Sequence, residues 1–304
     1  MIRFICLLSV VLFCNCHPEK KDNQIINVSV LRGPTAIAFA QWMENPPVIE
    51  GRKIVIRIVD TPDLMQAILI RQRTDIAVLP MVNAANLYNK GIHYLLAGCP
   101  IWGTLYMVEK ADIHPDDHSL YIFGAGANPD IITRYYLEQK GLTYAFDYSF
   151  SSAREIMQAL YMGKAARAVL GEPFLSTALQ RDSTLHIIAD LNNPANTSSG
   201  FAQTAVLYAP SLKEYRNQLD SLLSLSCRFA NEHPQEVIRV LESKNVFPAG
   251  TLTSESIKRC QINYLTVDRA KESIRSFLQV MYNYEPKSTG GKLPDDGFIT
   301  GGKE

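Results

Sequence analysis

The stretch VSVLRGPTAIAFAQW, residues 28–42, sets the fold that we expect for the whole chain. Its first four residues are typical of a short buried strand, Gly33-Pro34 of a tight turn, and residues 35–42 of a helix. Proline suits the first position of a helix, because the N–H that it lacks has no partner there and its φ is already set. The N–H groups of that first turn carry the positive end of the helix dipole. The turn therefore predicts a site for a small anionic or polar group at the end of the strand.

The same arrangement of strand, capping residue, proline and helix returns three times along the chain. Thr61-Pro62 follows an apolar run, and so do Asn128-Pro129 and Glu172-Pro173. In open α/β sheets, ligands bind outside the carboxyl ends of the strands, where turns of this kind gather. Four such turns in a regular order predict two lobes that face a cleft.

Length and composition favour a globular protein with two domains. A chain of 304 residues exceeds what one simple core usually serves. The formal net charge is zero, and the sequence has no basic block with interleaved aromatic residues. We therefore expect no nucleic-acid partner.

Residues 1–16 differ from the rest of the chain. Arg3 precedes an apolar run that ends near Phe13, and the sequence then becomes abruptly polar. The run is too short to cross a bilayer, which takes about 20 residues, so we interpret it as an export signal. The end of this segment, Phe13-Cys14-Asn15-Cys16, resembles the lipobox of bacterial lipoproteins, although Phe13 and Asn15 depart from the usual residues. The resemblance implies lipidation at Cys16 with residues 17–24 as a tether, and plain secretion is the alternative.

Three cysteines follow this segment, namely Cys99, Cys227 and Cys260. They lack the CxxC spacing and the neighbouring histidines of a metal centre, so we expect no metal site. Cys99 lies in an apolar run and is expected to be a small buried residue. Whether Cys227 and Cys260 form a disulfide is left open.

The order of the predicted elements gives the domain boundaries. Strands and helices alternate up to residue 108, which predicts a largely parallel sheet with helices on both faces. The polar segment 110–119 is expected to lead into a second lobe, and the loop 191–200 to lead back. After one further strand the chain is helical to residue 284. We therefore assign residues 25–109 with 204–285 to lobe 1, residues 110–203 to lobe 2, and residues 286–304 to a flexible tail.

Four features together resemble the substrate-binding proteins of bacterial ABC importers, in the branch of the nitrate, taurine, alkanesulfonate and thiamine-precursor binders. They are the exported N-terminus, the Gly33-Pro34-Thr35-Ala36 turn, the Asp-Ile-Ala transition within residues 69–78, and the Glu172-Pro173-Phe174 turn. The resemblance implies the periplasmic binding protein type 2 fold, an α/β architecture of two Rossmann-like lobes joined by two crossovers, with a helical C-terminal part. It also implies a monomer in the cell envelope, on the periplasmic side, that binds a small-molecule ligand and delivers it to an ABC transporter permease.

The candidate ligand contacts lie at the predicted turns, and each has a simpler structural alternative. The Gly33-Pro34-Thr35 turn could present amides and a hydroxyl to an oxyanion, and its alternative is that it only starts a helix. Asn83 has helix capping as its alternative, and Trp102 has packing in the core. The candidates are Gly33, Pro34, Thr35, Asn83, Trp102, Gly126, Asn128, Glu172 and Phe174.

Two of these turns bear on what is bound. The segment around Gly126 superficially matches a dinucleotide fingerprint, but Pro129 stands where the third glycine is required, so we expect no nucleotide cofactor. We expect Gly126 and Asn128 to contact an oxyanion or an amide of the ligand instead of a nucleotide. Glu172 could accept hydrogen bonds from an amine, which favours a zwitterion or an amino-heterocycle over an inorganic anion. The alternative is that Glu172 only stabilises the N-terminus of the following helix through the helix dipole.

We expect no enzymatic activity and no cofactor. The histidines lie in unrelated settings, and no Gly-x-Ser-x-Gly, Cys-His or HExxH arrangement is present. An enzyme on the same fold, of a precursor-forming or lyase type, is the first alternative, and the export signal argues against it. An exported ligand sensor is the second alternative.

Overall fold

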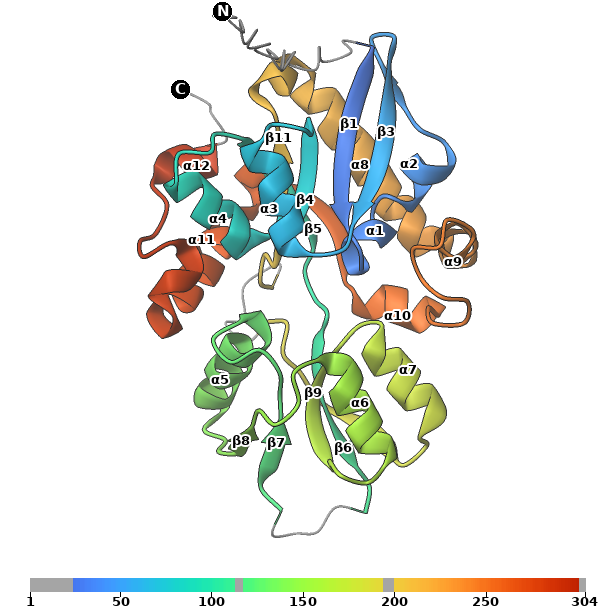
Figure 1. Ribbon diagram of the computed structural model, residues 1–304, viewed down its shortest axis with the longest axis vertical. Coiled ribbons are helices and arrows are strands. Elements are labelled where there is room, and N and C mark those ends of the chain that lie inside the picture. Colours follow the sequence, from blue (N-terminus) through green and yellow to red (C-terminus); the bar gives the residue numbers. More distant parts are fainter. Residues whose placement is uncertain (1–23, 113–116, 194–199, 301–304) are drawn as a thin grey trace, which may run out of the picture.

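The computed structural model describes residues 24–112, 117–193 and 200–300. The predicted export signal, Cys16 and nearly all of the tether lie outside the described residues. Within them, two β-sheets with flanking helices form an upper and a lower lobe along the long axis of the molecule (Figure 1). This confirms the predicted mixed α/β class with two lobes.

The first sheet has seven strands in the order β12-β5-β11-β4-β1-β3-β2. β1 pairs in parallel with β3 and β4, whereas β11 runs antiparallel between β4 and β5, and β12 runs antiparallel to β5. The prediction of a largely parallel sheet is therefore only partly right, because strands from the C-terminal half insert into it. The bounds are β1 Ile25–Leu31, β2 Val48–Ile49, β3 Arg52–Val59, β4 Ile76–Pro80, β5 Leu95–Ile101, β11 Thr204–Tyr208 and β12 Ile262–Thr266.

The second sheet has five strands in the order β10-β6-β9-β7-β8. Its bounds are β6 Leu105–Lys110, β7 Ser119–Tyr121, β8 Ala145–Asp147, β9 Arg167–Gly171 and β10 Leu185–Asp190. β6 pairs antiparallel with both β9 and β10, so the strand predicted before residue 109 belongs to lobe 2. The first crossover is thus at residues 102–104, and the polar segment 110–119 connects β6 to β7 within lobe 2 instead of leading into it.

Helices cover both sheets (Figure 1). The predicted helix over residues 35–42 is broken into α1 and α2, because Phe39 leaves the helical region with φ −109° and ψ 6°. α8 packs against α2 and β12, and α11 packs against α4 and β5, so the C-terminal helices support lobe 1 as expected. The helices of lobe 1 are α1 Pro34–Ile37, α2 Ala40–Glu44, α3 Pro62–Ile70, α4 Met81–Asn89, η1 Pro210–Tyr215, α8 Arg216–Glu232, α9 Pro234–Ser243, α10 Ser254–Arg259, α11 Val267–Tyr284, η2 Pro286–Thr289 and α12 Asp296–Thr300. Lobe 2 contains α5 Asn128–Lys140, α6 Ala153–Tyr161 and α7 Phe174–Arg181.

The predicted flexible tail is wrong for residues 286–300. Phe298 and Ile299 of α12 are buried in the core, and the Asn89 side-chain amide donates to the carbonyl oxygens of Thr289 and Lys292. The glycine-rich composition of the segment indicated a loop, but these contacts, with the hydrogen bond of Tyr88 to Asp295 and the ion pair of Arg275 with Asp296, hold it on lobe 1. Residues 301–304 lie outside the described part.

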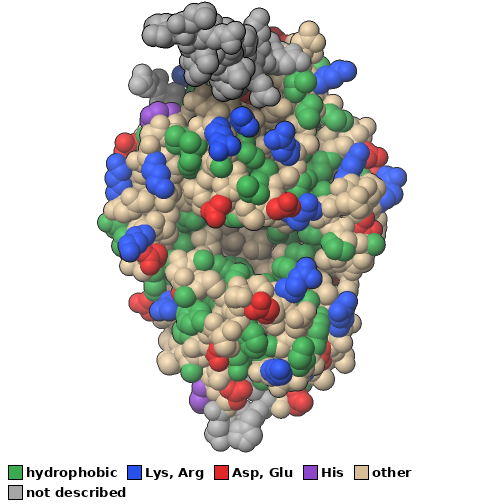
Figure 2. Space-filling view, viewed as in Figure 1, with side chains coloured by type: hydrophobic (Ala, Val, Ile, Leu, Met, Phe, Trp, Pro, Cys, Tyr) green, Lys and Arg blue, Asp and Glu red, His purple; other side chains and the backbone are tan. Residues whose placement is uncertain are grey.

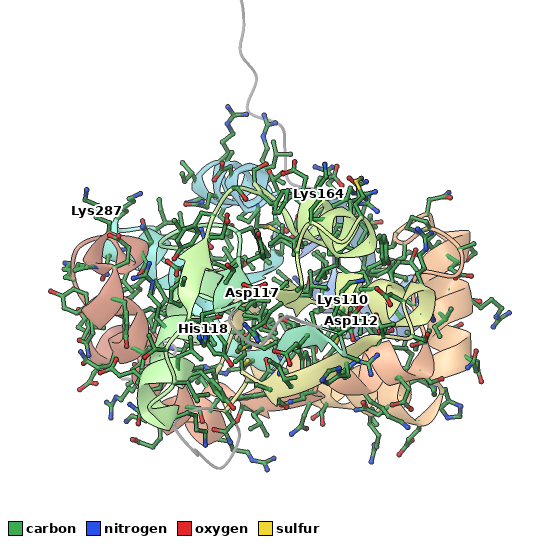
Figure 3. The ribbon with its side chains drawn as sticks, turned by 90° about the horizontal axis from the view of Figure 1, so that it is seen from below. Lys110, Asp112, Asp117, His118, Lys164 and Lys287 are labelled. Carbon is green, nitrogen blue, oxygen red and sulfur yellow. The ribbon has the colours of Figure 1, made fainter. Side chains whose placement is uncertain are left out.

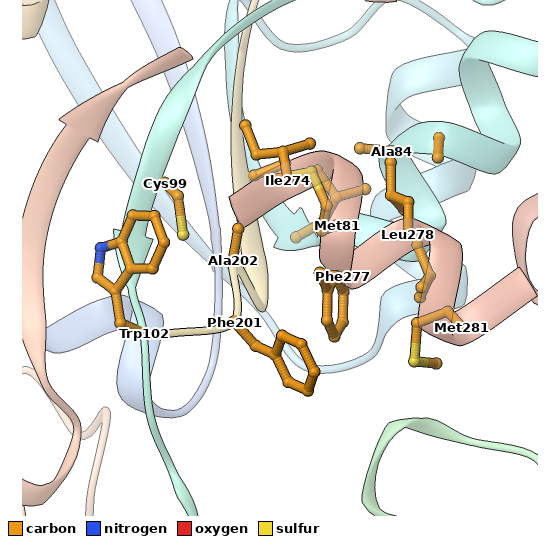
Figure 4. Packing of buried hydrophobic residues seen from close by; sticks show 14 of the residues in the cluster. Met81, Ala84, Cys99, Trp102, Phe201, Ala202, Ile274, Phe277, Leu278 and Met281 are labelled. Carbon is orange, nitrogen blue, oxygen red and sulfur yellow. The ribbon is translucent and has the colours of Figure 1, made fainter. Parts of the chain in front are cut away.

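The core of lobe 1 beside the hinge is built largely from the C-terminal helix α11. Phe277 of α11 packs against Phe201, with ring centroids 5.4 Å apart, and Ile274, Leu278 and Met281 extend the same contact (Figure 4). The same apolar cluster continues into lobe 2 through residues such as Tyr135, which lies 5.8 Å from Phe201. The lobes therefore share packing at the hinge. No helix among the described residues is long and apolar enough to span a membrane.

Candidate ligand-binding cleft

The two lobes face each other with the carboxyl ends of their parallel strands. β1, β3 and β4 end at the lower side of lobe 1, and β9 ends at the upper side of lobe 2, where the Glu172 amide donates to the Thr104 carbonyl of the crossover. The space-filling view shows the surface hollowed between the two halves (Figure 2). The turns after β1 and β9 therefore lie on the sides of the two lobes that face each other, the end of the strands at which α/β proteins bind ligands.

The turn after β1 forms part of lobe 1's side of the cleft. Gly33 has φ 124° and ψ −156°, a conformation that residues with a Cβ rarely adopt, and no atom lies within 4 Å of where a Cβ would be. Thr35, by contrast, is 6% exposed, and its hydroxyl donates to the Leu31 carbonyl oxygen at 2.5 Å. The hydroxyl that we expected to face a ligand therefore points back to its own strand, and the open backbone at Gly33-Pro34 is the accessible part of this turn.

Asn83 and Trp102 differ in how the structure places them. α4 begins at Met81 with Pro80 in the capping position and no side-chain cap, so the capping alternative for Asn83 is wrong. Asn83 lies further into the first turn and is partly buried. Trp102 is 2% exposed, packs near Cys99 and donates its indole N–H to the Asn263 carbonyl at 2.7 Å (Figure 4). Its surroundings are those of the core alternative.

The turn before α5 already holds an anion of the chain itself. The Gly126 amide donates to the Asp130 carboxylate at 2.7 Å, and that buried carboxylate also accepts from the Arg134 Nε and the Tyr148 hydroxyl, both at 2.7 Å. Asn128, the first residue of α5, is partly buried. The amide predicted to bind a ligand oxyanion is thus engaged in this conformation. Sequence analysis missed Arg134 and Tyr148: Arg134 follows Asp130 by four residues on the same helix, which was a signal, whereas Tyr148 lies 18 residues away and had none.

Glu172 lies at the end of β9 and is deeply buried. Its carboxylate, with the side chain 1% exposed, pairs with the Arg259 guanidinium at 2.5 Å and accepts from the Ser176 hydroxyl at 3.0 Å and the Ser176 amide at 3.2 Å. Burial raises the pKa of Glu172, and the hydrogen bond from Arg259 only partly offsets this. Its neighbour Phe174 begins α7, is partly buried and lies 5.8 Å from the Arg154 guanidinium.

The pair of Arg259 with Glu172 joins the two lobes. Arg259 ends α10, one of the C-terminal helices that pack on lobe 1, and its carbonyl also accepts from the Tyr106 hydroxyl of β6 at 2.8 Å. At the other side of the cleft, the Tyr284 hydroxyl of α11 donates to the Glu138 carboxylate of α5. α10 with α7, and α11 with α5, therefore flank the space between the lobes (Figure 1).

The hinge between the lobes is tightly packed. Asn192 is fully buried, and its Oδ1 accepts from the Thr104 amide at 2.8 Å, the Leu105 amide at 3.0 Å and the Gln203 side chain at 3.2 Å. This residue ties the outward crossover to the returning one. A Cβ on Gly103 would lie 2.6 Å from the Gln261 side chain and 2.9 Å from that of the buried Asn192, so these side chains would have to shift to admit it.

The cysteines and acidic groups give no metal centre among the described residues. Cys99, Cys227 and Cys260 are buried and unpaired, which answers the question left open for the last two. Burial raises the pKa of the Cys99 thiol to about 11 and that of Cys227 to about 12, so these thiols stay protonated at neutral pH.

Two lobes joined by two crossovers, with strand ends opposed across a cleft, define the class of two-lobed α/β binding proteins. A crystal structure of an ABC transporter protein from Parabacteroides distasonis is 55% identical, with a TM-score of 0.88, over 91% of this chain and 99% of that one. Because this likeness extends over nearly the whole of both chains, the protein belongs to the periplasmic substrate-binding proteins of ABC transporters, and it acts outside the cytoplasm.

More distant solved structures share the fold. The periplasmic aliphatic sulphonate-binding protein SsuA of Escherichia coli is 13% identical, with a TM-score of 0.69, over 91% of each chain. The ligand-binding component of an ABC-type import system from Staphylococcus aureus is 12% identical, with a TM-score of 0.63, over 92% of this chain and 98% of that one. Protein-family models and curated proteins gave no match.

Proposed function

We propose that the protein captures a small zwitterionic or amino-heterocyclic metabolite between its lobes and delivers it to an ABC importer permease. The observation that carries this proposal is the opposition of strand ends across the hollow between lobes that only two crossovers join. Such a hinge allows the lobes to close, and a ligand that contacts both lobes favours the closed state by its difference in affinity for the two states. Membership of the binding-protein family supports the proposal.

The charges at the cleft favour a ligand with both polar donors and acceptors over a simple inorganic anion. The N-terminus of α5 is already compensated by Asp130, and Glu172 adds a second carboxylate next to the crossover. Each carboxylate is paired with an arginine, Asp130 with Arg134 and Glu172 with Arg259, so these two pairs are neutral as a whole and offer a simple anion no unpaired cation. A zwitterion or an amino-heterocycle, in contrast, carries both donors and acceptors, which can bind the more exposed pair of Arg134 and Asp130 on one side and the open backbone at Gly33 on the other.

We also propose that Cys16 carries a lipid anchor and that the chain acts as a monomer without enzymatic activity. The lipobox-like end of the predicted signal supports the anchor. Residues 17–24 would then tether the folded part to the membrane, where the permease lies. An exported ligand sensor is the alternative use of the same cleft.

A thermal-shift screen with a matched pair of variants tests the proposal. A panel of amino acids, sulfonates, nitrate and thiamine precursors is added to the purified protein, and at least one compound is expected to raise its melting temperature. Asn83→Ala is expected to reduce that rise, because Asn83 lies in the first turn of α4 at the cleft. Asn217→Ala, at an exposed position on α8, is the control and should retain the full rise.

Three outcomes of the thermal-shift screen would each contradict a different part of the proposal. A flat response to every compound in the panel counts against a small-molecule binding role of this kind. A rise that is equal in the two variants removes Asn83 from the site and leaves the binding role intact. A rise produced by nitrate alone overturns the ligand class.

A further inference from the structure

One exposed face of lobe 1 mixes cations with aliphatic side chains. Strand alternation places Lys53, Val55 and Arg57 on the same side of β3. The neighbouring helix α3 and the turn after it add Leu64, Ile70, Arg71 and Arg73, and a groove of about 250 Å³ lined in part by Arg57, Leu64, Arg71 and Arg73 connects the two elements. We call these seven residues the basic-aliphatic face.

The aliphatic members of this face are well exposed. Val55 is 47% exposed, Leu64 54% and Ile70 56%, so each presents apolar surface to the solvent. The space-filling view shows hydrophobic and cationic side chains mixed over the front of the upper lobe (Figure 2).

The cations of the face are not neutralised by neighbours. Within the described residues, the structure gives no ion pair to Lys53, Arg57, Arg71 or Arg73. Of the nearby carboxylates, Asp60 pairs with Arg32 at 2.7 Å and Asp63 accepts from Gln66. The hydrogen bond from Gln66 leaves the negative charge of Asp63 in place, but four exposed cations outnumber it, so the face carries a local excess of positive charge although the formal net charge of the whole chain is zero.

Among its described residues, the far end of lobe 2 brings cations and carboxylates together. Lys110 pairs with Asp182 at 2.9 Å and lies beside Asp112 in the view from below (Figure 3). Lys110 therefore has an acidic partner, which the structure, in the part of the chain that it describes, does not give to the cations of the basic-aliphatic face.

The chain enters the fold beside this face. The Gln24 carbonyl accepts from the Lys53 amide at 2.9 Å, and Ile25 pairs with Lys53 in the register of β1 and β3. Cys16 precedes Gln24 by eight residues, which span at most about 29 Å when fully extended. A lipid at Cys16 would thus keep Lys53, at one end of the basic-aliphatic face, within about that distance of the bilayer.

We infer that the basic-aliphatic face docks on an anionic membrane surface. This inference rests on the lipid anchor of the proposed function. A single acyl chain gives only marginal membrane binding, and a second signal of basic and apolar residues stabilises it. Each Lys or Arg near an anionic leaflet increases the binding constant about fivefold, and exposed aliphatic side chains add to this by entering the interface. α3 begins at the cleft side of lobe 1, so docking holds the cleft close to the membrane that contains the permease.

Vesicle sedimentation of the purified full chain carrying Cys16→Ser tests this inference without a lipid anchor. The vesicles contain either phosphatidylcholine alone or phosphatidylcholine with about one third phosphatidylglycerol, and the difference in binding between them is the measured quantity. That difference removes any contribution that the apolar N-terminal segment makes to both vesicle types. We expect more binding to the anionic vesicles and loss of the excess in about 0.5 M salt.

Two double variants with the same change in charge complete the experiment. Arg71→Gln with Arg73→Gln should reduce the excess binding about 25-fold, at about fivefold for each cation. Lys164→Gln with Lys287→Gln changes two exposed cations away from the face and should leave the excess nearly unchanged. All four side chains are exposed, so circular dichroism and melting temperature should not change.

Equal loss in the two double variants, or no excess on anionic vesicles in the parent chain, overturns the inference. If the parent shows no excess but the Arg71 and Arg73 variant impairs delivery to the permease, the face binds an acidic protein instead. The outcome is separate from the ligand-binding proposal, because the thermal shift by ligand does not depend on this face. Lipidation is measured separately, by the membrane fraction of cells that make the Cys16→Ser chain.

Discussion

Arg259 and Glu172 form a buried ion pair, and we expect replacement of Arg259 to destabilise the protein more than replacement of Glu172. Arg259→Met leaves the Glu172 carboxylate, with its side chain 1% exposed, without its counter-charge. Breaking a buried ion pair in this way costs about 3 to 5 kcal/mol. Because Ser176 still donates twice to that carboxylate, we expect the lower end, about 3 kcal/mol.

Glu172→Gln should be much milder. Arg259 is 21% exposed and can be hydrated, and the amide side chain introduced by the substitution can still accept from Ser176. We expect a loss of about 1 kcal/mol, the usual size for one hydrogen bond exchanged for water. The double variant should lose about as much as Glu172→Gln alone, since without the carboxylate no buried charge is left unpaired.

The pH dependence gives an independent check on the same pair. Burial raises the pKa of folded Glu172 above the ordinary value of 4.5. The stability that this group contributes is therefore fully present below about pH 4.5 and is lost as the pH rises through the folded pKa. Relative to Glu172→Gln, the parent protein should gain stability as the pH falls through that window, and the deficit of Arg259→Met should shrink as well.

Urea denaturation at several pH values measures these differences. For a chain of this size, a loss of about 3 kcal/mol corresponds to a fall in melting temperature of roughly 6 to 12 °C. The reasoning is refuted if Glu172→Gln destabilises the protein as much as Arg259→Met, or if the two losses add in the double variant.

Three further variants test other parts of the account. Gly103→Ala places a Cβ 2.6 Å from the Gln261 side chain at the hinge, so it should cost about 1 to 3 kcal/mol by thermal denaturation; an unchanged melting temperature would show that the hinge relaxes. Phe298→Ala should lower the free energy of unfolding by about 3 kcal/mol, because the ring is 2% exposed; no effect would mean that the tail adds nothing to the core. Cys16→Ser should move the protein from the membrane fraction to the soluble fraction of the cell envelope, and unchanged membrane association would refute lipidation at this residue.

Much of the architecture was accessible from local sequence signals. The Gly33-Pro34 turn, the alternation of strands and helices and the two lobes follow from capping residues, prolines and hydrophobic period, each of which acts over a few residues. The strand at 105–110 could not be assigned to its sheet in this way, because its partner β9 lies about 60 residues further along the chain. Pairing over that distance leaves no local trace.

The cleft was harder to predict than the fold for a related reason. The sequence identified Glu172 and Gly126 as candidates but not the groups that hydrogen-bond to them. Arg259, the partner of Glu172, could not be found because it lies 87 residues away along the chain. Asp130 was visible as an acid in the first turn of its helix, but its contact with the Gly126 amide depends on the path of the turn. For the C-terminal tail the prediction gave too little structure. Its glycine content indicated a flexible segment, although Phe298 is buried in the core.

Closure of the lobes on a ligand is the central claim, and an interlobe distance measures it directly. Spin labels on cysteines introduced at Leu64 in lobe 1 and Met162 in lobe 2, which are 54% and 65% exposed, report that distance by electron paramagnetic resonance. The buried native thiols at positions 99, 227 and 260 should react little with the label. When the compound that raises the melting temperature is added, the distance distribution should shift to shorter values and saturate at one ligand per chain. An unchanged distribution at full occupancy would contradict the account.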